Sequence, residues 1–415
     1  MNGRSLRVHP TKASNSFFKR AKPGRMDPEV KVRVLRTTQD IEELREVWES
    51  WPGCRDSHID LFLTVLREPG VVRPHVIVIY HRDQPQAMLV GRIDRKPLDF
   101  RVGYIHVRPM ADILYFVYGA LRGNSSLDNS ALFLDEIRRA LVQGEADAAY
   151  LNFLRTESHL FRLAKTFSSF LTRDHASSYQ SHFSVTLPRS AEEFYRSLSS
   201  TTRYNHKKKA AKLLADHKGL VNIRCYKDIA EVDRLIEDVE TVARTSYQRG
   251  LGVGFAASQE IRERLLLKAQ NGWLRCYVLY VEDRSRAFWI GDVNGSTFGS
   301  DYLGYDADFA KYSPGMYLVT KVIEGFCDGH EKGISEVDFA PGHSQYKQVL
   351  ANHEWREEAV YIFAPTVKGM GLTLLRSVTG GLDQFVKKTL ANTQLLQRIK
   401  KMWRTHARSK QIATA

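Results

Sequence analysis

The chain has 415 residues, 43% of them hydrophobic, which is enough to build the cores of two or three domains. Its net charge of +14 lies at the two ends: residues 1–32 carry eight Lys and Arg against two acidic residues, and residues 366–415 carry ten against one. The body between them is therefore nearly neutral, which is not expected of a nucleic-acid-binding protein. No run of about 18 apolar residues is present, so no membrane-spanning helix is expected, and the spacing of the four Cys and 14 His predicts reduced thiols and no metal site.

Residues 1–29 are basic and lack the apolar segment of a secretory signal, so the sequence predicts a disordered arm and a cytoplasmic protein. After this arm, three segments recur in the same order about 185 to 200 residues later. They read as strand–turn–acidic helix, as hairpin, and as helix–loop–strand. The pairs are Val30–Trp51 with Leu220–Val242, His75–Ile93 with Trp273–Val293, and Ala131–Phe153 with Met316–Phe339.

This repeat predicts an α/β fold of the α+β layer type, with two tandem domains that each contain a mixed twisted sheet flanked by helices. The expected domains are residues 30–185 and 220–365. A helical, basic bridge (186–219) joins them, with a helix expected from Phe194 to Leu214. Its lysines either form a solvated face or contact a ligand, and the sequence leaves both open.

The stretch "GYDADFAKYSPGMYLVTKVIEGF" (Gly304–Phe326) reads as a strand, a loop and an apolar helix. Ser313, Pro314 and Gly315 directly before the helix are typical of a capped N-terminus, whose free N–H groups and dipole also suit a phosphate. An ordinary cap and a phosphate-binding loop are therefore both compatible with these residues. The corresponding stretch of the first half, Gly119–Ala131, has no Ser-Pro-Gly, so a single working site in the second half is expected.

The motifs "YDADFAKYSPGMYL", "VDFAPGHSQYKQ" and "TSYQRGLGVGF" together resemble the CelD-like GNAT acetyltransferases, which are associated by name with cellulose biosynthesis and related to the Fem-type tandem-GNAT transferases. The resemblance covers roughly Val30 to Pro365. It implies an acetyl-CoA or acyl-CoA donor and no metal. It also implies a pyrophosphate site at Tyr312, Ser313, Pro314, Gly315 and Met316. The loop has one glycine, where many GNAT enzymes carry the richer Q/R-x-x-G-x-G/A signature.

Transfer of an acyl group to an amine needs a proton acceptor and a group that stabilises the developing oxyanion, although proximity alone contributes much of the rate. Asp338 is the first candidate for the proton acceptor, and Asp306 before the donor loop is a weaker one. Tyr346 and Lys347 are candidates near the thioester carbonyl, and His343 ranks last. Each of these also has an ordinary structural reading, as a turn former, a strand-end cap or a surface residue. Tyr247, Arg249 and Phe255 are the expected acceptor-binding residues.

The leading hypothesis is transfer of an acyl group from coenzyme A to an amine of an envelope or polysaccharide-related acceptor. A Fem-type aminoacyl-tRNA-dependent peptidyltransferase and a non-catalytic accessory protein of exopolysaccharide synthesis are the alternatives. Residues 366–415 are predicted to form a basic amphipathic tail, with a helix from Leu382 that Gly380 and Gly381 separate from what precedes it. This helix either docks on the second domain or brings the enzyme to the anionic inner face of the plasma membrane.

Overall fold

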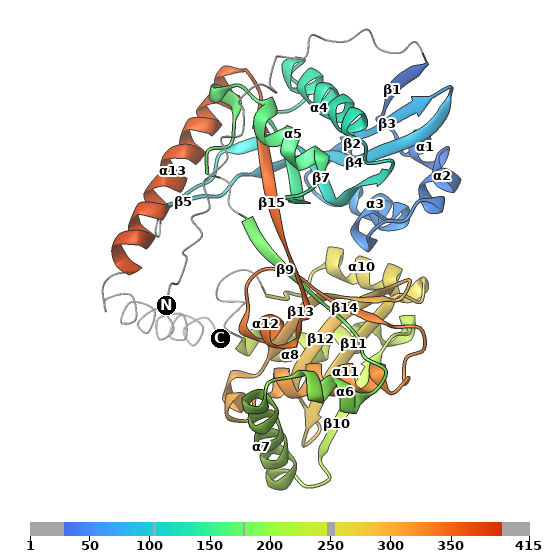
Figure 1. Cartoon of the computed structure of the whole chain (residues 1–415), viewed down its shortest axis with the longest axis vertical. Helices are drawn as coiled ribbons and strands as arrows, with labels where there is room; N and C mark the ends of the chain where they lie inside the picture. Colours follow the sequence, from blue (N-terminus) through green and yellow to red (C-terminus); the bar gives the residue numbers. More distant parts are fainter. Residues whose placement is uncertain (1–28, 103–104, 177–178, 247–253, 392–415) are drawn as a thin grey trace, which may run out of the picture.

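The computed structural model describes residues 29–102, 105–176, 179–246 and 254–391. Within these ranges a 13-stranded mixed sheet runs through the whole molecule, and helices cover its faces (Figure 1). The first half contributes β1 (Val30–Leu35), β2 (Val71–Pro74), β3 (Val76–His81), β4 (Gln84–Pro97), β7 (Met110–Gly123) and β8 (Ala148–Arg155). The second half contributes β10 (Val221–Tyr226), β11 (Leu274–Val281), β12 (Arg284–Asn294), β13 (Thr297–Tyr305) and β14 (Glu336–Pro341).

Two further strands join the halves, and the helices follow the strands in a repeated order. The joining strands are β9 (Tyr179–Thr186) and β15 (His353–Phe363), and a separate hairpin pairs β5 (Phe100–Val102) with β6 (Ile105–Val107). The first half carries α1 (Thr38–Glu42), α2 (Arg45–Ser50), η1 (Arg55–Ser57), α3 (Ile59–Val65), α4 (Leu127–Val142), α5 (His159–Phe167) and η2 (Phe170–Thr172). The remainder carries α6 (Ala191–Ser197), α7 (Ser200–Asp216), η3 (Ile229–Glu231), α8 (Val232–Thr245), α10 (Gln259–Gln270), η4 (Ala307–Tyr312), α11 (Pro314–Cys327), α12 (Gln345–Leu350) and α13 (Val367–Ala391).

The predicted α/β fold with a repeated mixed sheet is confirmed, because both halves contain a strand, helices, an antiparallel hairpin, and then a strand, a helix and a parallel strand. Even the hairpin turns match: Arg82-Asp83 and Glu282-Asp283 all have φ between 52° and 60°. Two consecutive left-handed residues form the turn whose twist suits adjacent strands. The four cysteines are free thiols, as the sequence predicted.

The two halves exchange a strand. β9 leaves the first half and pairs with β14 of the second, whereas β15 leaves the second half and pairs with β8 of the first. β9 and β15 then pair with each other, which makes the sheet continuous (Figure 1). Each exchanged strand is buried in its new surroundings: Val360 and Ile362 belong to the core of the first half, and Phe183 and Val185 to that of the second.

Two expectations about helices need correction. The bridge helix expected from Phe194 to Leu214 is two helices, α6 and α7, because Ser199 caps a new helix by accepting a hydrogen bond from the Thr202 N–H. The prediction that Gly380 and Gly381 separate the terminal helix from what precedes it is wrong, since α13 continues through both. Gly380 instead allows close packing, because a Cβ atom there would lie 2.3 Å from the Cβ atom of Ala176. Residues 392–415 lie outside the described ranges.

Candidate functional site

The candidate site lies at the end of the interior strands β13 and β14 at which the two strands separate. This end of the sheet is called its edge below. These parallel strands pair only over Thr297–Gly299 and Glu336–Asp338. β13 ends at Tyr305, and the chain returns through η4 and α11 before β14 begins, so the N-terminus of α11 lies at the same edge as Asp338 (Figure 1). A strand–helix–strand crossover always brings the helix N-terminus to the carboxyl ends of its strands, where ligands of open α/β sheets bind.

Asp338 is the first residue of a chain of buried polar groups at this edge. Its Oδ1 atom lies 2.5 Å from Nε2 of His182, whose Nδ1 atom lies 3.1 Å from Oε2 of Glu357. Glu357 in turn accepts hydrogen bonds from the hydroxyl of Tyr118 (2.9 Å) and the indole of Trp355 (2.6 Å). His182 and Glu357 are almost fully buried, whereas the side chain of Asp338 is 31% exposed. The chain of contacts therefore connects an accessible carboxylate to two inaccessible groups.

The environment of His182 favours its protonated form. Burial alone would lower the pKa of His182, but hydrogen bonds and charge from Asp338 and Glu357 outweigh burial and raise it above its usual value. The imidazole also stacks on Trp355 at 4.2 Å between ring centres. Burial and the Glu357 carboxylate raise the pKa of Tyr118, which therefore stays a hydrogen-bond donor. When Asp338 takes up a proton, it loses its negative charge. An imidazolium that contacts both Asp338 and Glu357 can respond to this change, because it interacts with both carboxylates.

Lys347 lies close to Asp338 but is engaged with the backbone. Its ammonium group donates hydrogen bonds to the carbonyls of Ala340 (2.9 Å) and Pro341 (3.0 Å). Ala340 has a φ of 62°, and its N–H donates to Asp338 Oδ1, so Lys347 braces the turn that orients this carboxylate. Burial lowers the pKa of Lys347 to about 8, against the opposing attraction of Asp338. Tyr346 packs edge-on against Phe339 within the core of the second half.

The predicted donor loop leads into α11 by an unusual route. Pro314 is the first helical residue, as its position suggested, but Ser313 has φ 53° and ψ 57° and makes no side-chain cap. Gly315 and Met316 are first-turn residues, so the helix provides no carbonyl partner for their N–H groups. A Cβ atom on Gly315 would lie 3.3 Å from the ring of Tyr305, so this glycine lets α11 pack closely on β13.

Lysines from the basic helix α7 surround this loop. Lys209 donates a hydrogen bond of 2.7 Å to the hydroxyl of Ser313, and Lys212 and Lys311 lie over the ring of Tyr312. The hydroxyl of Tyr312 donates to Asp216 at the end of α7, which fixes the helix beside the loop. Positive charge is thus concentrated at a helix N-terminus that already favours anions.

The other predicted residues divide into three groups. Asp306 is buried, caps η4 by accepting from the Asp308 N–H, and pairs with Arg286 at 2.7 Å, so its contacts are those of a turn former. Phe255 is buried and lines a pocket beside β13. Tyr247 and Arg249 lie outside the described residues.

The sequence did not indicate His182, Glu357 or Tyr118 as site residues, and it left open whether the bridge lysines, which include Lys209, contact a ligand. His182 is 156 positions from Asp338 in the chain, and only the strand exchange brings the two together. The corresponding edge of the first half differs: Ser126 caps α4 by accepting a hydrogen bond from the Asn129 N–H. Among the described residues, no three His, Cys, Asp or Glu side chains are arranged to hold a metal ion.

A family model matches the second half of the chain. Residues 200–348 match the family model described as an acetyltransferase (GNAT) domain. No curated protein matches the chain in sequence.

Three solved structures have similar arrangements of elements. FemX is 9% identical with a TM-score of 0.49, over 79% of this chain and 96% of that one. A tandem GNAT protein from the clavulanic acid biosynthesis pathway is 12% identical with a TM-score of 0.46, over 81% and 99%. A GCN5-related N-acetyltransferase from Kribbella flavida is 12% identical with a TM-score of 0.37, over 80% and 71%. The match over residues 200–348 identifies a GNAT acetyltransferase domain in the second half of the chain.

Proposed function

We propose that the chain transfers an acetyl or longer acyl group from coenzyme A to an amine at the edge where β13 and β14 separate. The observation that carries this proposal is the position of Asp338, which is accessible, linked to His182 and Glu357, and at the same edge as the N-terminus of α11. The GNAT match implies an acyl donor and an amine acceptor. The CelD-like grouping and an envelope or polysaccharide acceptor remain part of this proposal.

In the proposed reaction, the amine nitrogen attacks the thioester carbonyl carbon and the carbon–sulfur bond breaks. The amine gives a proton to the Asp338 carboxylate, and the departing thiolate of coenzyme A takes up a proton to become a free thiol. The His182 imidazolium stabilises the negative charge of Asp338 before the transfer and couples it to Glu357. Lys347 acts as a positioning residue, because its hydrogen bonds hold the turn after Asp338.

The donor's pyrophosphate is proposed to bind at Tyr312, Ser313, Pro314, Gly315 and Met316. The first-turn N–H groups and the dipole of α11 supply the anion site, and Lys209 supplies a mobile positive charge next to it. The Lys209 side chain would exchange its hydrogen bond with Ser313 for one with a phosphate oxygen.

Replacing Lys209 by Ala is therefore expected to weaken acetyl-CoA binding about tenfold, because a hydrogen bond to a charged group is lost. Isothermal titration with acetyl-CoA measures this change. Lys208→Ala on the same helix is the matched control, since the ammonium group of Lys208 lies over the ring of Tyr204. Equal affinities of wild type and Lys209→Ala would contradict the donor site.

An aminoacyl-tRNA donor is the second candidate, favoured by the exposed basic face of α7 beside the same loop. RNA binding through several phosphates would weaken steeply as salt increases, whereas a single pyrophosphate contact depends on salt much less. Titrations of tRNA and of acetyl-CoA at low and high salt distinguish the two donors. Binding of neither would favour the non-catalytic accessory role.

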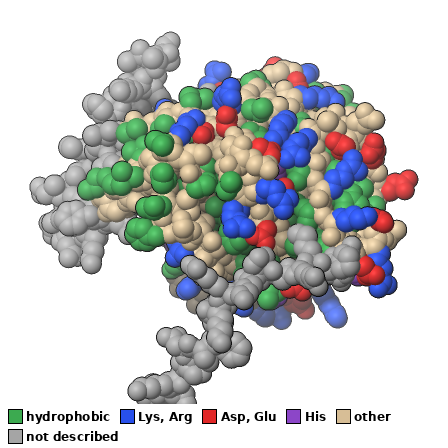
Figure 2. Space-filling model, turned by 90° about the horizontal axis from the view of Figure 1, so that it is seen from above, with side chains coloured by type: hydrophobic (Ala, Val, Ile, Leu, Met, Phe, Trp, Pro, Cys, Tyr) green, Lys and Arg blue, Asp and Glu red, His purple; other side chains and the backbone are tan. Residues whose placement is uncertain are grey.

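The surface of α13 supports a proposal about location. Large apolar side chains are exposed along one side of this helix, and they are Val367 (87%), Met370, Leu374 (67%), Val378 and Leu382. Figure 2 shows hydrophobic side chains gathered on the left of the view, the side on which α13 lies in Figure 1. The sequence that follows, residues 383–415, contains eight Lys and Arg and one Asp. An apolar helix face next to basic residues suits an anionic membrane surface. Within the described ranges, no helix is both long and apolar enough to cross a bilayer.

The double substitution Leu374→Asp and Val378→Asp is expected to lower binding to phosphatidylglycerol vesicles by about tenfold or more, because two apolar contacts become charged. Co-sedimentation with these vesicles and with phosphatidylcholine vesicles measures the effect. Leu127→Asp on α4, another exposed leucine, is the control. If wild type sediments equally with both kinds of vesicle, the tail does not bind anionic membranes.

A further inference from the structure

A pocket of about 260 Å³ lies where the first half meets the second. One wall comes from η1 and α3 of the first half, and the other from α10, β12 and β13. Its apolar lining is Leu61, Phe255, Ile261, Leu265 and Ile290. Its polar lining is Asp56, Arg264, Lys268, Asp301 and Tyr302. The pocket thus offers an apolar surface with charged groups at selected positions, as small-molecule sites do.

The positive groups of the pocket are already paired. Lys268 forms ion pairs with Asp292 (2.7 Å) and with Asp301, and Arg264 forms a two-pronged pair with Glu68 at 2.6 Å. Asp56 differs: within the described part of the chain it has no hydrogen bond or ion pair. Its side chain is accessible within the pocket. One carboxylate therefore faces the pocket without an ion-pair partner of its own.

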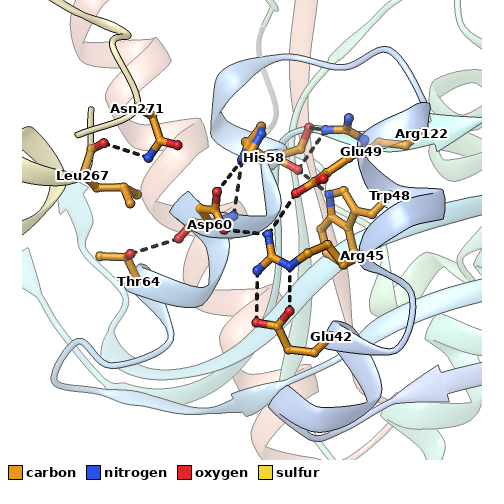
Figure 3. A network of polar contacts seen from close by, with 11 residues as sticks. Glu42, Arg45, Trp48, Glu49, His58, Asp60, Thr64, Arg122, Leu267 and Asn271 are labelled. Atoms are coloured by element: carbon orange, nitrogen blue, oxygen red, sulfur yellow. Dashed lines mark hydrogen bonds and ion pairs between the residues drawn. The ribbon is translucent and has the colours of Figure 1, made fainter. Parts of the chain in front are cut away.

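Asp56 is held firmly in this position. It lies in η1, and the next residue, Ser57, is anchored from two sides. The indole of Trp48 donates to the Ser57 carbonyl at 2.9 Å, and the guanidinium of Arg122 donates to the same carbonyl at 3.0 Å. Farther along, Arg45 pairs with Asp60 at the start of α3, close to α10 of the second half (Figure 3). A carboxylate fixed by its backbone binds a ligand without a large ordering cost.

Asp338 lies on the same face of the sheet as Ile290, which lines the pocket, because Ile290 and Asp292 alternate onto one face of β12. Asp292, Gly299 and Asp338 are consecutive cross-strand partners on β12, β13 and β14. Asp292 and Asp338 are separated by two strand spacings, roughly 10 Å, and Gly299 between them has no side chain. Asp338 is not among the residues that line the pocket. A molecule in the pocket can therefore extend over Gly299 toward Asp338 with its far end beside Asp56 and Asp301.

We infer that the acceptor carries a second positively charged group beyond its reacting amine, joined to it by an apolar stem, and that Asp56 of the first half binds this group together with Asp301. This inference rests on the proposed function, because the bound molecule is taken to be the acyl acceptor. The acceptor class is thus a diamine or an amine with a separate basic group. Asp56 is a specificity-determining residue, and it makes the first half a necessary part of the site of the second.

The electrostatic surroundings of Asp56 agree with its having no ion-pair partner of its own. Although its side chain is accessible from the pocket, enclosure by the surrounding protein atoms raises the pKa of Asp56 to about 6, and the negative charge of Asp301 raises it further, whereas Lys268 opposes the shift. A cationic ligand would favour the charged carboxylate, so its binding would weaken as the pH falls below about 6. The groups that face Asp56 from the opposing elements are Arg264, Lys268, Asp292 and Asp301.

The test uses three probes of equal length with the full chain: 1,6-diaminohexane, 6-amino-1-hexanol and n-heptylamine. All three carry an amine that can be acylated, and only the first has a second cation. Isothermal titration without donor at pH 7.5 gives the dissociation constants, and acetylation assays with acetyl-CoA give KM and kcat. The diamine is expected to bind wild type about 30-fold more tightly than the amino alcohol, as expected for a desolvated charge pair.

The variant Asp56→Asn is expected to abolish this preference while it leaves the affinity for acetyl-CoA unchanged. Asp128→Asn, an exposed acid at the start of α4, has the same change in net charge and is expected to keep the preference. Equal binding of diamine and amino alcohol by wild type, or a preference that persists in Asp56→Asn, would overturn the inference. The proposed function is tested separately, by titration with acetyl-CoA and by acetylation of n-heptylamine. If n-heptylamine is acetylated and the diamine is not preferred, the acyl-transfer function is retained and the inference of a second cationic group is rejected.

Discussion

Replacing Asp338 by Asn is expected to lower the turnover of acyl transfer by about 100-fold or more, while acetyl-CoA binds with unchanged affinity. Asparagine has nearly the same shape and keeps a hydrogen bond with His182, but it cannot accept the amine's proton. Steady-state kinetics with acetyl-CoA and an amine, together with donor titration, separate the two effects. The residual rate reflects proximity of donor and acceptor.

Glu336→Gln is the matched control for this variant. Glu336 lies on β14 two residues before Asp338, so both side chains face the same side of the sheet. The Glu336→Gln substitution removes one carboxylate and leaves the contact between Asp338 and His182 in place, so turnover is expected to stay nearly unchanged. Equal turnover of Asp338→Asn and wild type would remove Asp338 from the chemistry, although the donor site would be unaffected.

Replacing His182 by Ala is expected to destabilise the fold by about 3–5 kcal/mol, because two carboxylates then lose their shared buried partner. The folded-state pKa of His182 is raised, so its stabilising contribution is fully present below the unfolded value near 6.5 and is lost as the pH rises through the folded-state pKa. The difference between wild type and variant is therefore expected to be larger at pH 6 than at pH 9.

Urea unfolding at the two pH values measures this difference. His353→Ala is the control, since His353 lies on β15 in an exposed position and contacts the hydroxyl of Thr186. A loss of stability that is equal at pH 6 and pH 9 would show that His182 is not an imidazolium between Asp338 and Glu357. The variant would then report only the lost packing against Trp355.

Much of the fold could be predicted because its signals are local. Alternating apolar residues around Arg82-Asp83 and Glu282-Asp283 indicated the two hairpins, and Ser313-Pro314 indicated where α11 begins. Asp338 was predicted from the resemblance to the GNAT enzymes, in which the strand after the donor helix lies beside the acyl group, and its role stays a prediction. These features depend on neighbours within about 20 residues, so the period of the side chains and the turn residues determine them.

The strand exchange could not be predicted in this way. Nothing in the residues of β9 and β15 says which half each strand joins. His182 and Glu357 meet because their strands pair, at a separation of 175 residues. The sequence also misled at the glycines of α13. Gly380 was expected to interrupt the helix, whereas it allows close packing against Ala176, and hydrophobic periodicity carries no information about such a tertiary contact. Asp56 was missed for the same reason, since its pocket forms only where the halves meet.

The most direct test of the account is incubation of the purified full chain with acetyl-CoA and 1,6-diaminohexane, with mass spectrometry of the amine and a thiol assay for free coenzyme A. The proposed acyl transfer with Asp338 as the proton acceptor is expected to give equal amounts of N-acetylated diamine and free thiol, at a rate that Asp338→Asn lowers by about 100-fold. If acetyl-CoA binds but neither product forms above the background with this amine or the two monoamine probes, the edge between β13 and β14 is not an acyl-transfer site for alkyl amines. If both products form at the same rate with Asp338→Asn, Asp338 is not the base that the account requires.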